Sequence, residues 1–146
     1  MAYTHQGIQE FDKEIKELLD KGLTRNSRSP HNSPAFMVRN HAEEKRGKAR
    51  MVINYKKLND NTLFDGYYIP NKTVIFNRIQ GASWFSKMDC KSGYWHIRMD
   101  EESIPLTFST PQRDYEWIVM LFGLKNAPQI FQRRMDNIFK DLIIVF

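Results

Sequence analysis

Asp89 is the residue of this sequence whose side chain is best placed to do chemistry. It ends an apolar stretch, residues 84–89, that is typical of a buried strand, and a small turn with Tyr94 and Trp95 follows it. A carboxylate is tolerated inside a protein mainly when it is paired or when it holds a cation. The pattern therefore indicates a cation-binding carboxylate. The alternative is an aspartate that faces water at the end of its strand.

The positive charge of the chain is concentrated in residues 39–57. This segment holds seven lysines or arginines and two glutamates, so it accounts for the whole net charge of +5. Residues 81–146, by contrast, hold eight basic and eight acidic side chains. A local basic surface predicts a polyanionic partner, because neutralisation of phosphates drives such binding. A loop whose charges are merely solvated is the alternative.

The composition predicts one packed intracellular domain, or part of one, and leaves the compartment open. With 146 residues and 41% hydrophobic side chains, the chain is long enough to build a core. The single cysteine, Cys90, excludes internal disulfides, and the four histidines lack the spacing of zinc ligands. No signal peptide pattern opens the sequence, and its longest apolar run is far shorter than the ~20 residues that span a bilayer. A membrane partner is therefore not expected.

Hydrophobic periodicity predicts helices and antiparallel strands in mixed order, which is the α+β class. The expected helices cover residues 8–19, ending before Gly22, residues 71–79, ending before Gly81, and a last helix that opens at residues 126–128. The expected strands are residues 35–38, 50–55, 84–89, 95–99, 106–110 and 115–121, with a basic hairpin loop at 39–49.

Three other segments have plain structural interpretations. The prolines at positions 30 and 34 argue against a central strand in the connector at residues 28–34. The acidic residues 100–102 are expected to form a solvated turn rather than a metal site. In the last helix, an apolar stripe is expected to pack into the core; it consists of Phe131, Met135, Ile138 and Leu142.

Four motifs occur in an order and spacing that resemble one family. They are residues 29–36, the basic hairpin and strand at 45–55, the acidic motif at 85–95, and residues 115–117 followed by 122–128. Together they resemble the reverse transcriptase domain of plant pararetroviruses (caulimovirus-like) and, more distantly, of gypsy-type retrotransposons. The resemblance covers nearly the whole chain. It implies right-hand polymerase fingers at roughly residues 22–80 and 97–126, and a partial palm at roughly 81–96 and 127–146.

This resemblance implies RNA-directed DNA polymerase chemistry with Mg²⁺. In such enzymes two metal ions stabilise the attacking 3′-hydroxyl of the primer and the leaving oxygen of the nucleotide. The implied partners are an RNA or DNA template with its primer, and deoxynucleoside triphosphates. Asp89 would be the catalytic, metal-binding carboxylate, with the backbone carbonyl of Cys90 beside it. Few carboxylates suffice, because magnesium also takes phosphate oxygens and water as ligands.

The resemblance also implies a set of nucleotide-binding residues. The set consists of Arg50, one or more of Lys45, Arg46 and Lys48, and the three residues Tyr94, Phe122 and Gly123. Lys125 and Asn126 lie close to this set in the sequence and are the implied nucleic-acid contacts. Arg50 would grip the triphosphate with its planar fork, and Tyr94 would crowd a ribose 2′-hydroxyl. The alternatives are a surface ion pair of Arg50 with one of the nearby glutamates, and aromatic residues that only fill the core.

Several features depart from the family pattern. Leu121 stands where the family has a proline, and the strand near residues 106–109 is one residue shorter. No adjacent pair of aspartates occurs in the chain, and the thumb and ribonuclease H regions are absent from it. The expectation is therefore a fragment of a larger polyprotein that lacks a complete metal site and is inactive alone. The alternative is a remnant of an integrated pararetroviral element that binds nucleic acid without chemistry.

Overall fold

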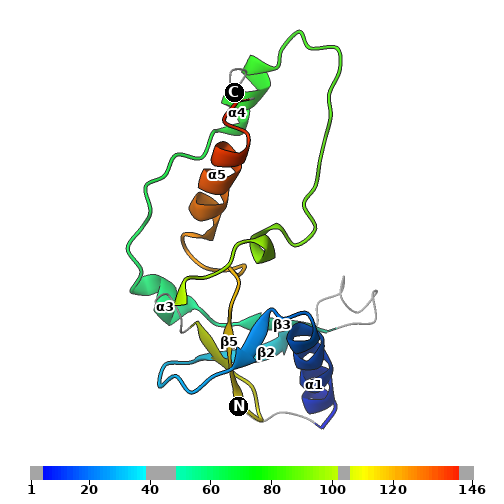
Figure 1. Cartoon of the computed structure of the whole chain (residues 1–146), viewed down its shortest axis with the longest axis vertical. Coiled ribbons are helices and arrows are strands. Elements are labelled where there is room, and N and C mark those ends of the chain that lie inside the picture. The colour runs from blue at the N-terminus through cyan, green and yellow to red at the C-terminus, as the bar shows by residue number, and fades with distance from the viewer. Residues whose placement is uncertain (1–4, 39–48, 102–105, 142–146) are drawn as a thin grey trace.

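The computed structural model describes residues 5–38, 49–101 and 106–141 and falls into two parts (Figure 1). One part contains a β-sheet covered by the first helix. The other is drawn out into long connections around two helices. In these described ranges, no helix is both long and apolar enough to cross a membrane.

The sheet is mixed and contains five strands in the order β1-β5-β4-β2-β3. The strands are β1 (Thr24–Asn26), β2 (Ser33–Val38), β3 (Arg50–Ile53), β4 (Thr107–Ser109) and β5 (Asp114–Trp117). All neighbours are antiparallel except β2 and β4, which run parallel. The expected strands at residues 35–38, 50–55 and 106–110 are confirmed, and β5 is shorter than the predicted 115–121.

The expectation that prolines keep the connector out of a central strand is wrong for Pro34. This residue lies in β2, which has neighbours on both sides. It is accommodated because β2 changes partners along its length: β4 pairs with Ser33 and Pro34, and β3 pairs with residues 35–38. The carbonyl of Pro34 still accepts a hydrogen bond, from the N–H of Asn54 at 3.0 Å.

The helices follow the stop and start signals of the sequence. Helix α1 (His5–Asp20) ends two residues before Gly22, which has φ +64°. Helix α4 (Lys72–Arg78) begins at Asn71, whose side chain accepts a hydrogen bond from the N–H of Thr73. Helix α5 (Ala127–Ile138) has a proline in its first turn. Two short helices were not predicted, α3 (Lys56–Asp60) and the 3₁₀ helix η1 (Gly93–His96).

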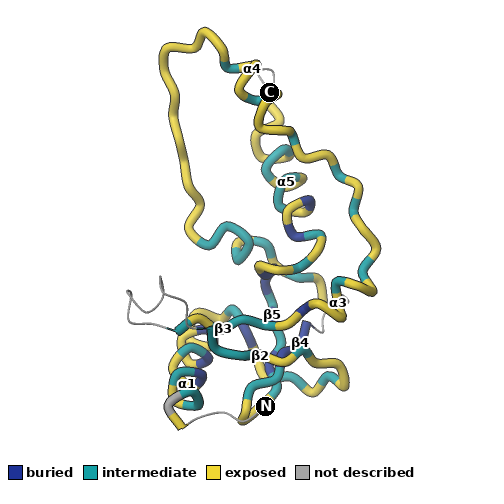
Figure 2. The backbone as a smooth tube through the Cα atoms, turned by 180° about the vertical axis from the view of Figure 1, so that it is seen from behind, coloured by how far each residue is buried: buried dark blue, intermediate teal, exposed yellow. Residues whose placement is uncertain are grey.

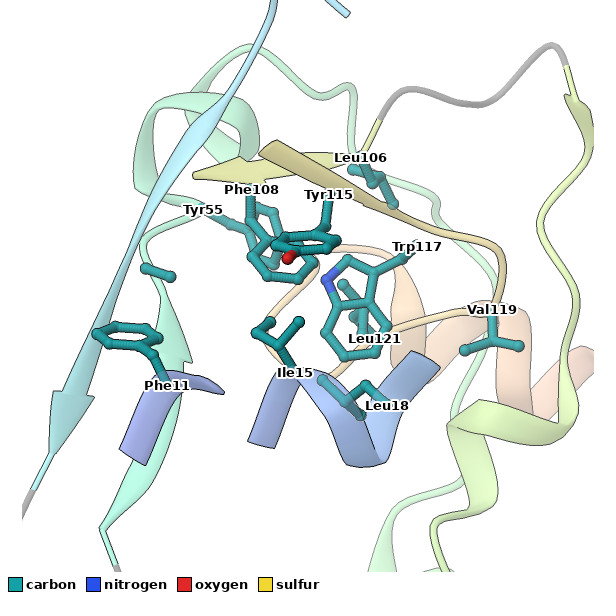
Figure 3. Close-up of a cluster of buried hydrophobic side chains, with 11 residues drawn as sticks. Phe11, Ile15, Leu18, Tyr55, Leu106, Phe108, Tyr115, Trp117, Val119 and Leu121 are labelled. Carbon is teal, nitrogen blue, oxygen red and sulfur yellow. The ribbon is translucent and has the colours of Figure 1, made fainter. Parts of the chain in front are cut away.

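The core lies between α1 and the sheet (Figure 3). Phe11, Ile15 and Leu18 of α1 are buried against aromatic side chains of β4 and β5. The ring of Phe108 packs 5.7 Å from that of Tyr115 and 5.3 Å from that of Trp117, measured between centroids. These rings join β4 and β5 into one buried aromatic cluster.

Residues 84–89 do not form the predicted strand. They lie in an extended and exposed connection, seen in yellow in Figure 2, where Trp84 is 92% and Met88 83% exposed. A strand forms only where a neighbour completes its hydrogen bonds, and no described strand lies beside this segment. Asp89 is therefore exposed in this structure rather than buried.

Two further expectations about local structure are wrong. Instead of a strand at residues 95–99, the 3₁₀ helix is followed by a single β-bridge between Arg98 and Val119. In α5, Ile138 is 64% exposed, so the apolar stripe does not pack into a core along its length. Leu142, its fourth member, lies outside the described residues. The predicted solvated turn is consistent with Asp100 and Glu101, which are both exposed.

Candidate functional site

A cavity of about 480 Å³ opens where the sheet, α1 and the loop after β5 meet. Its walls come from α1, from Arg50–Ile53 of β3, from Ser92 and Trp95, and from residues 121–123. Three predicted site residues therefore line one cavity, although they are far apart in sequence: Arg50, Phe122 and Gly123. Arg50 is exposed, so its guanidinium is accessible to a ligand in solution.

Tyr94, a fourth predicted residue, packs beside this cavity. Its ring lies 4.8 Å from that of Phe122 and 5.3 Å from that of Phe131 on α5, between centroids. Gly93 permits this packing, since a β-carbon there would meet the Phe131 ring at 3.1 Å. Tyr94 is half-buried and Phe122 is 49% exposed, so neither is an ordinary core residue.

Three aromatic residues in the cavity walls carry a buried polar atom without a hydrogen-bond partner in the described structure. They are Tyr55 (Oη), Trp95 (Nε1) and Trp117 (Nε1). Burial raises the pKa of Tyr55, and the nearby indole of Trp117 lowers that pKa in part, without the geometry of a hydrogen bond. This wall is therefore formed largely by aromatic rings, but three of its buried polar atoms make no hydrogen bond in the described structure.

The loop after Phe122 is tied to helix α3 and to the connection that follows it. Lys125 donates from Nζ to the carbonyl of Thr62 at 2.8 Å, and Asn126 donates from Nδ2 to the carbonyl of Leu63 at 2.7 Å. Both predicted nucleic-acid contacts thus make intramolecular bonds here, and their binding role stays a prediction. Sequence reasoning missed Asn59, which also bonds to this loop.

A second polar cluster fixes α5 to the connection before α4. The hydroxyl of Tyr67 donates to Asp136 at 2.6 Å, and this bond raises the pKa of Tyr67. The guanidinium of Arg133 lies 4.5 Å from the centre of the Tyr67 ring and also binds Asp65. Because α5 carries Phe131, this cluster helps to position the aromatic ring that supports Tyr94.

The predicted metal ligands lie apart from the cavity lining. Asp89 and Cys90 are exposed in the extended connection, and neither lines the cavity. Within the described ranges, no group of three or more His, Cys, Asp or Glu side chains could hold a metal ion. One carboxylate does not make a magnesium site, so the described residues do not fit a complete one. The candidates Lys45, Arg46 and Lys48, and the glutamates proposed as alternative partners of Arg50, lie outside the described residues.

Comparison with known proteins identifies relatives over nearly the whole chain. A family model described as "Reverse transcriptase (RNA-dependent DNA polymerase)" matches residues 12–145. The "Enzymatic polyprotein" of Soybean chlorotic mottle virus is 55% identical over 144 residues, covering 97% of this chain and 21% of the relative. That of Cauliflower mosaic virus (strain CM-1841) is 53% identical over 141 residues, covering 96% and 21%. The chain thus spans about a fifth of the length of these relatives.

Two solved foamy virus structures have a similar fold. The foamy viral protease-reverse transcriptase in complex with RNA/DNA hybrid matches with a TM-score of 0.75 and 18% identity, over 97% of this chain and 19% of that chain. Native Prototype Foamy Virus protease-reverse transcriptase matches with a TM-score of 0.80 and 21% identity, over 96% and 18%. These similarities confirm the predicted α+β polymerase fold. The predicted boundaries between fingers and palm stay a prediction.

Proposed function

The chain belongs to the reverse transcriptase family, and on this premise we propose that it forms the nucleotide-binding part of an RNA-directed DNA polymerase. The observation that carries the proposal is the shared cavity of Arg50, Phe122 and Gly123, with Tyr94 packed against Phe122. A cation and an aromatic wall in one cavity suit a nucleoside triphosphate, which combines anionic phosphates with an apolar face. The polymerase as a whole is a longer polyprotein, as in the viral relatives.

In this proposal each side chain binds one part of the nucleotide. Arg50 donates hydrogen bonds to phosphate oxygens, aided by Lys45, Arg46 or Lys48 from the basic segment. The Tyr94 ring, held by Phe122 and Phe131, excludes a 2′-hydroxyl by crowding and so favours deoxynucleotides. Such positioning contributes to catalysis because it brings the reacting atoms together in a fixed orientation.

Asp89 is proposed as one magnesium ligand of the assembled polymerase, beside the carbonyl of Cys90. The metal ions supply charge stabilisation to the reacting phosphate when they are bound. The described residues provide one carboxylate for them, and we assign the other ligands to further parts of the polyprotein. The 146-residue chain alone is therefore expected to bind substrates without extending a primer.

The proposed nucleic-acid partner is an RNA template paired with a DNA primer. Two observations support this partner: the basic segment at residues 39–57, and the fold shared with a foamy virus enzyme described in complex with RNA/DNA hybrid. Phosphate neutralisation by this segment would hold the duplex whatever its sequence.

The test is binding of dATP to the 146-residue chain with a primed RNA template, measured by calorimetry in Mg²⁺. Arg50→Ala is expected to weaken binding about 10- to 100-fold, since charge-assisted hydrogen bonds contribute about 1.5–3 kcal/mol. Arg78→Ala, on exposed helix α4, is the matched control and should leave the affinity unchanged. Binding that is insensitive to Arg50 would overturn the proposal.

A second candidate is a module that binds nucleic acid without chemistry. It is favoured by the position of Asp89, which is exposed and does not line the cavity. Primer extension separates the two candidates when it is measured with the longer polyprotein and with its Asp89→Ala variant. Extension that depends on Asp89 supports the polymerase, whereas a polyprotein that binds hybrid but never extends it supports the binding module.

A further inference from the structure

The carboxamide of Asn59 joins helix α3 to the turn that carries Phe122 and Gly123. Its Nδ2 donates to the carbonyl oxygen of Gly123 at 2.8 Å, and its Oδ1 accepts from the backbone N–H of Lys125 at 2.9 Å. Both polar atoms of the Asn59 side chain are therefore hydrogen-bonded, to backbone groups on either side of Leu124. Gly123 has φ +88°, so this turn has a shape that favours glycine and that other residues rarely adopt.

Asn59 is also connected, through helix α3, to strand β3, which lines the same cavity. Helix α3 follows β3 after two residues, and one of these, Tyr55, is only 4% exposed. The N–H of Asn59 donates to the backbone carbonyl of Tyr55 at 2.8 Å, so helix α3 begins at a residue whose side chain is buried. Arg50 begins the same strand, β3. The carboxamide therefore joins the turn that carries Phe122 to the helix that directly follows the strand of Arg50.

The neighbouring bonds reinforce the far end of this turn. Lys125 donates from Nζ to the carbonyl of Thr62, and Asn126 accepts from the N–H of Asp65 at 3.0 Å. These bonds fix residues 125 and 126 at the start of α5. Asn59, in contrast, reaches back to the carbonyl of Gly123, the residue next to Phe122.

We propose that Asn59 is a positioning residue of the nucleotide cavity, which holds the turn of residues 122–125 on helix α3 and so fixes Phe122 relative to Arg50. The inference rests on the proposed function, because it assigns how that same cavity keeps its shape. Phe122 supports the Tyr94 ring, so a displaced turn loosens the wall that faces the sugar. Loss of the bridge should therefore reduce both nucleotide affinity and the preference for deoxynucleotides.

Substitutions at position 59 separate the bridge from side-chain size. Asn59→Leu keeps a similar volume but removes both hydrogen bonds. Asn59→Asp keeps the acceptor for the Lys125 N–H, but at neutral pH it places a carboxylate oxygen against the Gly123 carbonyl. When that carboxyl is protonated, it again offers one donor and one acceptor. The aspartate variant should therefore recover as the pH falls toward the carboxyl range, and the leucine variant should not.

The experiment measures dissociation constants of dATP and ATP for the 146-residue chain with a primed RNA template, at pH 4 and pH 8. At pH 8 both variants should bind dATP on the order of 10- to 100-fold more weakly than wild type, with a smaller dATP/ATP ratio. At pH 4, close to the ordinary aspartate pKa of about 3.9, roughly half of the carboxyls are protonated, so the aspartate variant alone should regain affinity relative to wild type. Asn61→Leu, which removes a bond to the carbonyl of Lys57 in the same helix, is the matched control and should change neither quantity.

The outcomes distinguish this inference from the proposed function. Wild-type chain that binds no dATP overturns both. Wild-type binding with unchanged affinity and unchanged dATP/ATP ratio in the Asn59 variants overturns the positioning role alone. If a variant does not fold, hydrogen exchange of the Lys125 amide in the wild-type chain decides instead. Slow exchange supports a formed bridge, and exchange at the rate of an unstructured amide overturns it.

Discussion

Replacing Tyr55 by phenylalanine should stabilise this chain, although it removes a polar group from a tightly packed wall. The Tyr55 hydroxyl is buried, and it has no hydrogen-bond partner in the described structure. A buried polar group without a partner costs its full desolvation penalty, about 1–3 kcal/mol. Tyr55→Phe leaves the ring, and therefore the packing, in place. The free energy of unfolding should rise by about 1–3 kcal/mol at neutral pH.

The same substitution should change the stability at alkaline pH. Burial raises the pKa of Tyr55 above its ordinary value of 10.0. The folded chain therefore keeps this proton above pH 10, where the unfolded chain has lost it. A raised pKa contributes stability that is fully present below pH 10 and is lost as the pH rises. Relative to Tyr55→Phe, wild type should lose about 1.4 kcal/mol per pH unit above pH 10.

The assay is urea unfolding followed by circular dichroism, at pH 7 and at steps above pH 10. With a urea slope of about 1–3 kcal/mol per molar, the midpoint of Tyr55→Phe should lie about 1 M above that of wild type at pH 7. Tyr68→Phe, in an exposed position, is the control and should leave the midpoint unchanged. A lower midpoint for Tyr55→Phe would refute the reasoning, because it would reveal a partner for the hydroxyl, such as a bound water.

Three further predictions concern packing and charge. Gly93→Ala should lower the free energy of unfolding by about 1 kcal/mol, because its β-carbon would meet Phe131 at 3.1 Å. Urea unfolding checks this against Gly66→Ala, which meets nothing within 4 Å, and equal midpoints would contradict it. Phe108→Ala should cost about 3–5 kcal/mol, since the ring is fully buried. Thermal unfolding tests it beside exposed Phe76→Ala, and similar melting temperatures would count against the assigned core. Affinity for an RNA/DNA hybrid should fall steeply with salt, by a logarithmic slope of about 0.9 for each neutralised phosphate. Affinity that stays flat between low and high salt would exclude phosphate-driven binding.

Local signals in the sequence determined the elements that need no distant partner. A helix satisfies its own backbone, so its capping and stop residues act within one turn of the chain. Asn71 caps α4 and Gly22 follows the end of α1, as the sequence predicts. Strands that alternate beside clear turn signals, such as β2 and β3, were also predictable. The order of the motifs predicted the family, and the comparisons confirmed it.

Only the tertiary structure decided which of these residues meet. Residues 84–89 have the composition of a strand, but a strand exists only with a neighbour, so Asp89 lies exposed and outside the cavity lining. The convergence of Arg50 with Phe122 depends on how the sheet is ordered, which no local pattern encodes. Asn59 carries no local sign of its role, because its two partners lie more than sixty positions away in the chain. The sequence determined the parts of the site through short-range chemistry, and long-range packing determined which of them lie together.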